Sequence, residues 1–145
     1  MANNPASVDV DRVLPVVVGA HLQAELSDRA SAYRACDVMS GLLGSALEPV
    51  VCTDVWYMNS EALRSRPTVS IGAPGINALG AHLADRLPSV FVIDDVLMVQ
   101  LDLVTAPPAA SCWGVDAEAT ARAVEVFCER HASAFLEAAS RTPVG

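Results

Sequence analysis

The sequence predicts a three-layer α/β/α sandwich with a mostly parallel sheet of four to five strands and an antiparallel strand at one edge. Three observations predict this fold class. Short, continuous apolar runs end at glycine or polar residues, as strands covered on both faces do. Segments with apolar residues at helical spacing separate these runs. One later segment alternates between apolar and polar residues, which is typical of a half-exposed strand.

The first half of the chain predicts a strand, a long helix and a second strand. Residues 13–20 form a continuous β-branched run that ends at alanine after Gly19. Residues 49–53 form a second short apolar run. Between them, apolar residues step by three and four, which predicts one long helix with a buried face. The expected buried positions are Leu22, Leu26, Ala30, Tyr33, Cys36, Met39, Leu43 and Leu47. An alternative start for this helix lies at Ser27-Asp28.

The middle of the chain continues the alternation of strands and helices. An aromatic segment, 54–59, and a short helical piece, 61–64, precede a third strand at 68–71. The turn Gly72-Ala73-Pro74-Gly75 then leads into a helix over 76–87, which Pro88 ends.

The last part predicts a hairpin and a terminal helix. Residues 90–93 form a fourth strand, and the alternating segment 96–104 follows the turn Asp94-Asp95. After a loop rich in proline and alanine, Asp116 is a good N-cap for a helix over 117–139. This order of elements is Rossmann-like in outline, with right-handed crossovers. It predicts one domain over 11–140 with flexible tails at 1–10 and 141–145.

The composition is apolar for a single small domain. Of the 145 residues, 52% are hydrophobic and 18% charged, and the mean hydropathy is +0.37. Either alanine and valine fill an ordinary core, or part of the apolar surface is hidden in an interface. We favour the second interpretation, which predicts a homo-oligomer or a protein partner.

The charge pattern excludes several classes of function. The formal net charge is −8, and the nine basic residues are all scattered arginines, which disfavours nucleic acid and anionic membranes as partners. No apolar run is long enough to span a bilayer, and the first residues lack the features of a signal peptide, so we expect a soluble cytoplasmic protein. Without lysine there is no Walker-type phosphate loop and no pyridoxal phosphate anchor.

The strongest candidate site lies at the carboxyl ends of the predicted parallel strands, where open α/β sheets bind ligands. The turn Gly72-Ala73-Pro74-Gly75-Ile76-Asn77 joins a strand to a helix, and its exposed N–H groups favour a small anion. His21 and Asp54 follow neighbouring strands and belong to the same crevice. The predicted ligand-binding residues are therefore Gly72, Ala73, Gly75, Asn77, His21 and Asp54. The alternative is a plain tight turn with Asn77 as a helix cap.

Catalytic candidates are fewer. Cys112 near the start of the last helix is a candidate nucleophile, with His21 as its base. The four cysteines otherwise predict buried free thiols, and no spacing of cysteine and histidine predicts zinc. Asp54, Asp94 and Asp95 could hold magnesium, although an Asp-Asp pair is also ordinary turn chemistry, and we predict no metal site. Trp56, Tyr57 and Trp113 form either an aromatic wall around a ligand or part of an interface. No motif specifies a cofactor.

Three functions remain open. The first is a small Rossmann-like domain that binds an anionic molecule or acts as a regulatory or assembly subunit. The second is a small hydrolase or transferase that uses Cys112 or His21 with Asp54. The third is a protein interaction module. A deep crevice at the strand ends favours the first two, whereas filled loops and an exposed apolar face favour the third.

Overall fold

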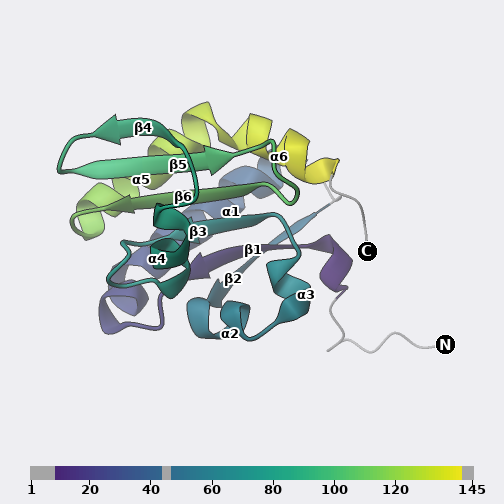
Figure 1. Cartoon of the computed structure of the whole chain (residues 1–145), viewed down its shortest axis with the longest axis horizontal. Coiled ribbons are helices and arrows are strands. Elements are labelled where there is room, and N and C mark those ends of the chain that lie inside the picture. Colours follow the sequence, from purple (N-terminus) through teal and green to yellow (C-terminus); the bar gives the residue numbers. More distant parts are fainter. Residues whose placement is uncertain (1–8, 44–46, 142–145) are drawn as a thin grey trace.

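The structure, a computed structural model that describes residues 9–43 and 47–141, is an α/β sandwich around a six-stranded sheet (Figure 1). The strand order is β2-β1-β3-β6-β5-β4. The strands are β1 (Val13–Val18), β2 (Glu48–Thr53), β3 (Thr68–Ile71), β4 (Ser89–Ile93), β5 (Leu97–Asp102) and β6 (Ala109–Gly114). β2, β1, β3 and β6 are parallel, and β5 is antiparallel to both of its neighbours. The Rossmann-like fold class is confirmed, with six strands in place of the predicted four to five.

Helices cover the two faces of the sheet unequally. The helices are α1 (Arg29–Leu43), α2 (Asp54–Met58), α3 (Glu61–Arg64), α4 (Ala78–Ala84), α5 (Ala117–Arg130) and α6 (Ala132–Ser140), and a short 3-10 helix (Val10–Arg12) precedes β1. The long helices α1, α5 and α6 pack on one face, which we call the covered face. The short helices α2, α3 and α4 lie on the other, which we call the open face. Most of the apolar core therefore lies between the sheet and α1, α5 and α6.

Strand β6 is the element that the sequence analysis missed. Its residues are Ala109-Ala110-Ser111-Cys112-Trp113-Gly114; the prediction placed the first three in a loop and assigned no strand to the rest. Small residues have low β-propensity, so the run gave no strand signal. They are needed because α5 passes very close to the strand: a Cβ on Gly114 would collide with Ala119.

The long predicted helix is present, but the first part of its predicted buried face is wrong, while Cys36 and Met39 face the core as predicted. Helix begins at Leu22, passes through a π-helical turn (Ala24–Asp28) and continues as α1. The side chains of Leu22, Leu26 and Tyr33 are 72%, 75% and 54% exposed. The residues that face inward in this first part are Ala24, Asp28, Ala32 and Ala35, whereas Met39, one of the predicted positions, is buried as expected. Small side chains let the first part of α1 approach the sheet closely, and Leu22, Leu26 and Tyr33 point outward.

The terminal helix is two helices rather than one. The chain leaves helical geometry at His131, where φ is −127° and ψ is −17°, and resumes in α6. Phe127 and Phe135 lie on either side of this break and pack edge to face at 5.7 Å between ring centroids. The bend thus directs both aromatic rings into one core. The predicted tails lie largely outside the described residues.

The β4–β5 hairpin is confirmed. Its turn contains Asp94 and Asp95, and Asp95 adopts a positive φ of 62°, which aspartate tolerates better than most residues. Asp54 lies beside β2, at the opposite edge of the sheet from this turn. The three aspartates therefore cannot share one metal ion.

Candidate functional site

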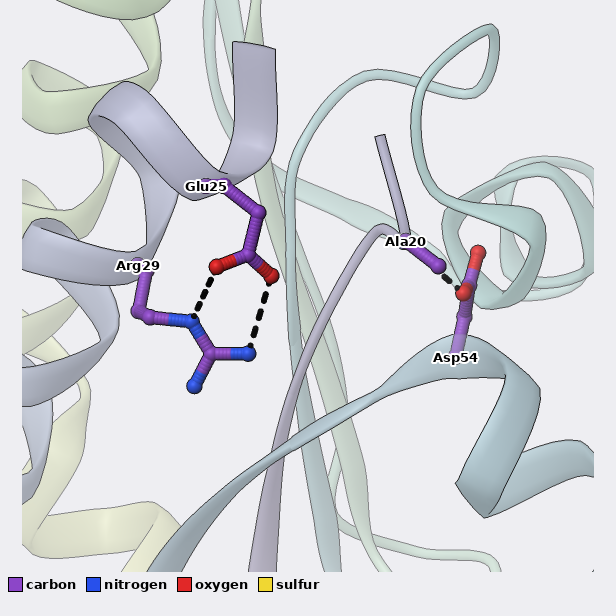
Figure 2. A network of polar contacts seen from close by, with 4 residues as sticks. All are labelled: Ala20, Glu25, Arg29 and Asp54. Carbon is purple, nitrogen blue, oxygen red and sulfur yellow. Dashed lines mark hydrogen bonds and ion pairs between the residues drawn. The ribbon is translucent and has the colours of Figure 1, made fainter. Parts of the chain in front are cut away.

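Asp54 is the first residue of α2, at the carboxyl end of β2, and its side chain is 6% exposed. Its Oδ1 atom accepts a hydrogen bond of 3.0 Å from the backbone N–H of Ala20, as Figure 2 shows. Its Oδ2 atom accepts one of 2.7 Å from the N–H of Ala78, the first residue of α4. The carboxylate therefore joins the loop after β1 to the start of α4, across three separate segments of the chain.

Asn77 is the N-cap of α4, as one sequence hypothesis predicted, and it is fully buried. Its Oδ1 atom accepts hydrogen bonds from the N–H groups of Leu79 and Gly80. Its Nδ2 atom donates to the carbonyl oxygens of Val17 and Ile71 and to Ser70 Oγ, at 2.9 to 3.1 Å. The side chain thus connects β1, β3 and α4 and has no unused hydrogen-bonding capacity.

These contacts occupy the amides that an anion would use at the Gly72–Asn77 turn. The N–H groups of Ala78, Leu79 and Gly80 already donate to Asp54 and Asn77. The N–H groups of Ile76 and Asn77 donate to the carbonyl oxygen of Ala73. The turn therefore carries its own internal anion, the Asp54 carboxylate, at the helix start.

The predicted glycines differ in what they do. Gly72 has a φ of +122°, a conformation that L side chains rarely adopt. Gly75 is exposed, and a Cβ there would meet nothing within 4 Å. Gly19, which was not among the predicted binding residues, is the close approach: a Cβ would collide with the carbonyl oxygen of Ile76. The loop after β1 and the Gly72–Asn77 turn therefore pack directly against each other, and this packing fills the space that the sequence predicted as a crevice.

Asp28 is the polar residue at this end of the sheet that the sequence analysis missed as a site residue. It closes the π-helical turn, is 1% exposed, and its Oδ1 atom has no hydrogen-bond partner among the described residues. Burial raises the pKa of this carboxyl, and the nearby His21 partly opposes that shift. Oδ2 lies 3.0 Å from the position that a Cβ on Gly72 would take. Ser27-Asp28 resembles an ordinary helix start in sequence, which hid this role.

The catalytic candidates do not form a reactive group. Cys112 lies on β6, is fully buried in the core of the covered face, and has a pKa raised far above the ordinary value by that burial. His21 is exposed at the mouth of the β1 loop, and its Nδ1 atom accepts a hydrogen bond from the N–H of Gln23. Both oxygens of Asp54 are engaged with backbone amides. Because Cys112 is buried in the core, its thiol cannot reach a substrate.

The aromatic residues do not line one site. Tyr57 is buried, and its hydroxyl lies 3.0 Å from Thr68 Oγ1 under the open face. Trp113 donates from Nε1 to Gln100 Oε1 on the neighbouring strand. Trp56, by contrast, is 72% exposed on α2. Of these three aromatic residues, Trp56 is the one whose ring is mostly accessible to another molecule.

A large hollow in the described part of the chain lies on the open face rather than at the strand ends. It is a groove of about 740 Å³ over β1 and β2, which we call the β1–β2 groove. Its lining is mostly apolar and includes Val13, Pro15, Val50, Cys52, Trp56 and Leu63. Glu48 is the one charged side chain in that lining. Strand β1 is buried along its whole length, whereas Glu48 and Val50 of the edge strand β2 are exposed on this side, although parallel sheets normally bury both faces.

A second uncovered strip lies at the other edge of the same face. Val90 and Val92 of β4 are 42% and 44% exposed, and Val92 pairs with Met98. Met98 in turn pairs with Trp113 on β6. Helix α4 contacts the middle of the sheet, at β3 and β6, so both margins of the open face remain apolar and accessible.

Compared with protein-family models and with curated proteins, the chain matches none. Within the described part of the chain, no helix has the length and apolar character needed to cross a membrane.

Proposed function

We propose that this chain is a noncatalytic assembly domain that docks another protein surface through its open face. One observation carries the proposal: the β1–β2 groove is lined mostly by apolar side chains, the edge strand β2 is partly exposed there, and the exposed Trp56 is part of the lining. Burial of such a surface in an interface removes apolar area from water, which is the main favourable term in protein association. Tryptophan is also enriched among the residues that dominate binding energy.

The polar groups and loops at the carboxyl ends of the parallel strands support the same proposal. A ligand crevice or active site needs unfilled space and groups with free hydrogen-bonding capacity. Here Asp54 and Asn77 bind the amides of the chain itself, and Gly19 packs against the Gly72–Asn77 turn. Filled loops together with an exposed apolar face are the combination expected of an interaction module.

Photo-crosslinking from the groove tests the proposal. A benzoylphenylalanine at Val55, which is 55% exposed on α2, is placed within reach of any docked surface. The matched control carries the same group at Ala134, an exposed position on α6 on the covered side. We expect a product of discrete mass from position 55 in cells that produce the chain, none from position 134, and loss of the product when Val50→Glu is added. No product from position 55 contradicts the proposal.

A second candidate is a small-molecule site at the strand ends. The observation that favours it is Asp28, whose buried Oδ1 atom has no partner in the described chain. Such an atom would accept a hydrogen bond from a donor group on a ligand. An anion at the Gly72–Asn77 turn is also part of this candidate, but it would have to displace Asp54 from the amide of Ala78. Calorimetry with inorganic phosphate, a nucleotide and a dicarboxylate tests it: heat that is lost in Gly75→Val supports the candidate, and no heat with any of the three contradicts it.

A further inference from the structure

A smaller hollow on the open face has a basic lining, although the chain as a whole is acidic. It has a volume of about 330 Å³ and is formed by residues of α2, α3 and α4 and by the first residues of β3 and β6. Among the described residues, its lining includes Arg64, Arg66 and His82 and no aspartate or glutamate. The chain has nine basic and 17 acidic residues, for a formal net charge of −8. This hollow, which we call the Arg66 pocket, therefore has the opposite charge to the molecule around it.

Arg66 is a buried charge without an opposite charge beside it. It is 6% exposed, and it is the one arginine that the described part of the chain buries. Its Nε atom donates a hydrogen bond of 3.0 Å to the carbonyl oxygen of Val13, which is a neutral acceptor. The three ion pairs formed within residues 9–43 and 47–141 include neither Arg66 nor Arg64. Removing a charged group from water is unfavourable unless an opposite charge or several hydrogen bonds compensate. A bound anion would supply that compensation.

Hydrogen bonds hold the backbone beside this guanidinium in place. The N–H of Arg66 donates to the carbonyl oxygen of Leu63 on α3, and the carbonyl oxygen of Arg66 accepts a bond of 2.8 Å from Thr68 Oγ1. Because Thr68 gives its one hydroxyl hydrogen to Arg66, the Tyr57 hydroxyl is the donor in the 3.0 Å contact between the two side chains. The wall around Arg66 is therefore rigid, whereas Arg64 is exposed and can turn toward a ligand.

We propose that the Arg66 pocket binds a small molecule that carries a phosphate or a carboxylate group. A guanidinium presents its N–H groups in a planar fork that matches two oxygens of either group, and such charge-assisted hydrogen bonds are stronger than neutral ones. His82 on α4 adds a ring N–H donor in either of its protonation states. Most of the other lining residues are apolar, among them Leu79, Leu83 and Pro107, so they suit a ligand with a small apolar body. This site goes beyond the docking function and does not depend on it.

Two exposed arginines make the test specific. Arg64 lies in the pocket lining, whereas Arg122 lies on α5 on the covered side. Arg64→Gln and Arg122→Gln each remove one positive charge, so the two variants have the same net charge and differ only in where the charge is lost. Arg66→Lys is the third variant, which keeps the buried charge but loses the planar fork. Thermal melts establish that all three are folded before binding is compared.

Heteronuclear NMR titration of the isotope-labelled full chain shows where an anion binds. The probes are inorganic phosphate and propionate, added at constant pH and ionic strength. We expect saturable changes in the amide shifts of Thr68, His82 and Ala109, which surround the pocket, with at least one probe. Saturable changes confined to the Gly72–Asn77 turn, or no saturable change with either probe, overturn the proposal.

The same titrations of the variants show which charges bind the anion. We expect the dissociation constant to rise at least about tenfold in Arg64→Gln and in Arg66→Lys and to stay within about twofold in Arg122→Gln. Equal weakening in Arg64→Gln and Arg122→Gln would show nonspecific attraction to positive charge and would overturn the proposal. Unchanged binding in folded Arg64→Gln and Arg66→Lys would also overturn it. The crosslink from position 55 uses neither arginine, so the docking function and this site succeed or fail separately.

Discussion

The Oδ2 atom of Asp54 accepts a hydrogen bond of 2.7 Å from the backbone N–H of Ala78, although the two residues belong to different helices. The other oxygen binds the amide of Ala20. Figure 2 shows the Ala20 contact, together with the separate ion pair of Glu25 and Arg29. A carboxylate of the chain thus stands where the sequence predicted a bound anion, and this gives the first prediction.

Asp54→Asn should destabilise the fold by about 1–3 kcal/mol, because an amide oxygen can replace only one of the two acceptors and the NH₂ group then faces a backbone donor. Urea unfolding followed by circular dichroism measures the change. Glu129→Gln, at an exposed site on α5, is the matched control and should stay within about 0.5 kcal/mol of the wild type. A loss for Asp54→Asn no larger than that of the control would show that these two contacts contribute little.

Gly72 and Gly75 should respond oppositely to alanine. Gly72→Ala forces a side chain into a φ of +122° and toward the Asp28 carboxylate, so it should cost about 1–3 kcal/mol. Gly75→Ala meets open space at a φ outside the left-handed region, so it should be neutral or stabilise by a few tenths of a kcal/mol. Thermal melts of both variants measure the difference. Equal losses would mean that the turn has a different backbone in solution.

Residues with strong local signals allowed the sequence to predict most of the elements. The β-branched run of β1, the cap at Asn77 and the Asp-Asp turn of the hairpin each depend on neighbours within a few positions. Strand β6 gives no such local signal, because its small residues fit a strand only through distant contacts, such as the close approach of α5 to Gly114. The orientation of α1 also depends on distant partners, since Tyr33 and Leu42 face outward whereas Ala32, Ala35 and Met39 face the core.

The sequence indicates where the residues of the candidate site lie, but not what these residues bind. Asp54, Gly72 and Asn77 do meet at the carboxyl ends of parallel strands, because parallel strands end at one edge of the sheet. That Asp54 and Asn77 bind backbone groups of the chain, rather than a ligand, depends on contacts between segments far apart in sequence, such as the close packing of Gly19 against Ile76. The β1–β2 groove had no local signal at all, because it results from the shortness of α2 and α3 and their position on the open face.

The four thiols should react slowly, and Cys112 slowest of all, which is the reverse of the order that the sequence suggests. Burial raises the pKa of Cys36, Cys52 and Cys128 to about 11, and that of Cys112 further. Only the thiolate reacts, so at pH 8 very little of any thiol is reactive. Alkylation followed by mass spectrometry measures these rates. Cys112 should be modified only as fast as the protein unfolds. The other three thiols are half-buried, so they should react earlier, and their rates should increase with pH. Early modification of Cys112 would show that β6 opens in the native state.

Asp28 should make the protein less stable as the pH rises from about 4. Its folded-state pKa is raised above the ordinary 3.8 by burial, so the folded state holds its proton when the unfolded chain has already released it. Stability from this group is therefore fully present below pH 3.8 and declines as the pH rises through the folded-state pKa.

Asp28→Asn cannot ionise and should lose this part of the pH dependence, so its stability relative to the wild type should increase between pH 4 and pH 7. Urea unfolding at several pH values measures both curves, with Asp94→Asn in the exposed hairpin turn as the control that keeps the wild-type slope. If the Asp28→Asn and wild-type curves stay parallel over this range, Asp28 has an ionisation equilibrium that folding does not change, and its unpartnered oxygen must find a donor in solution.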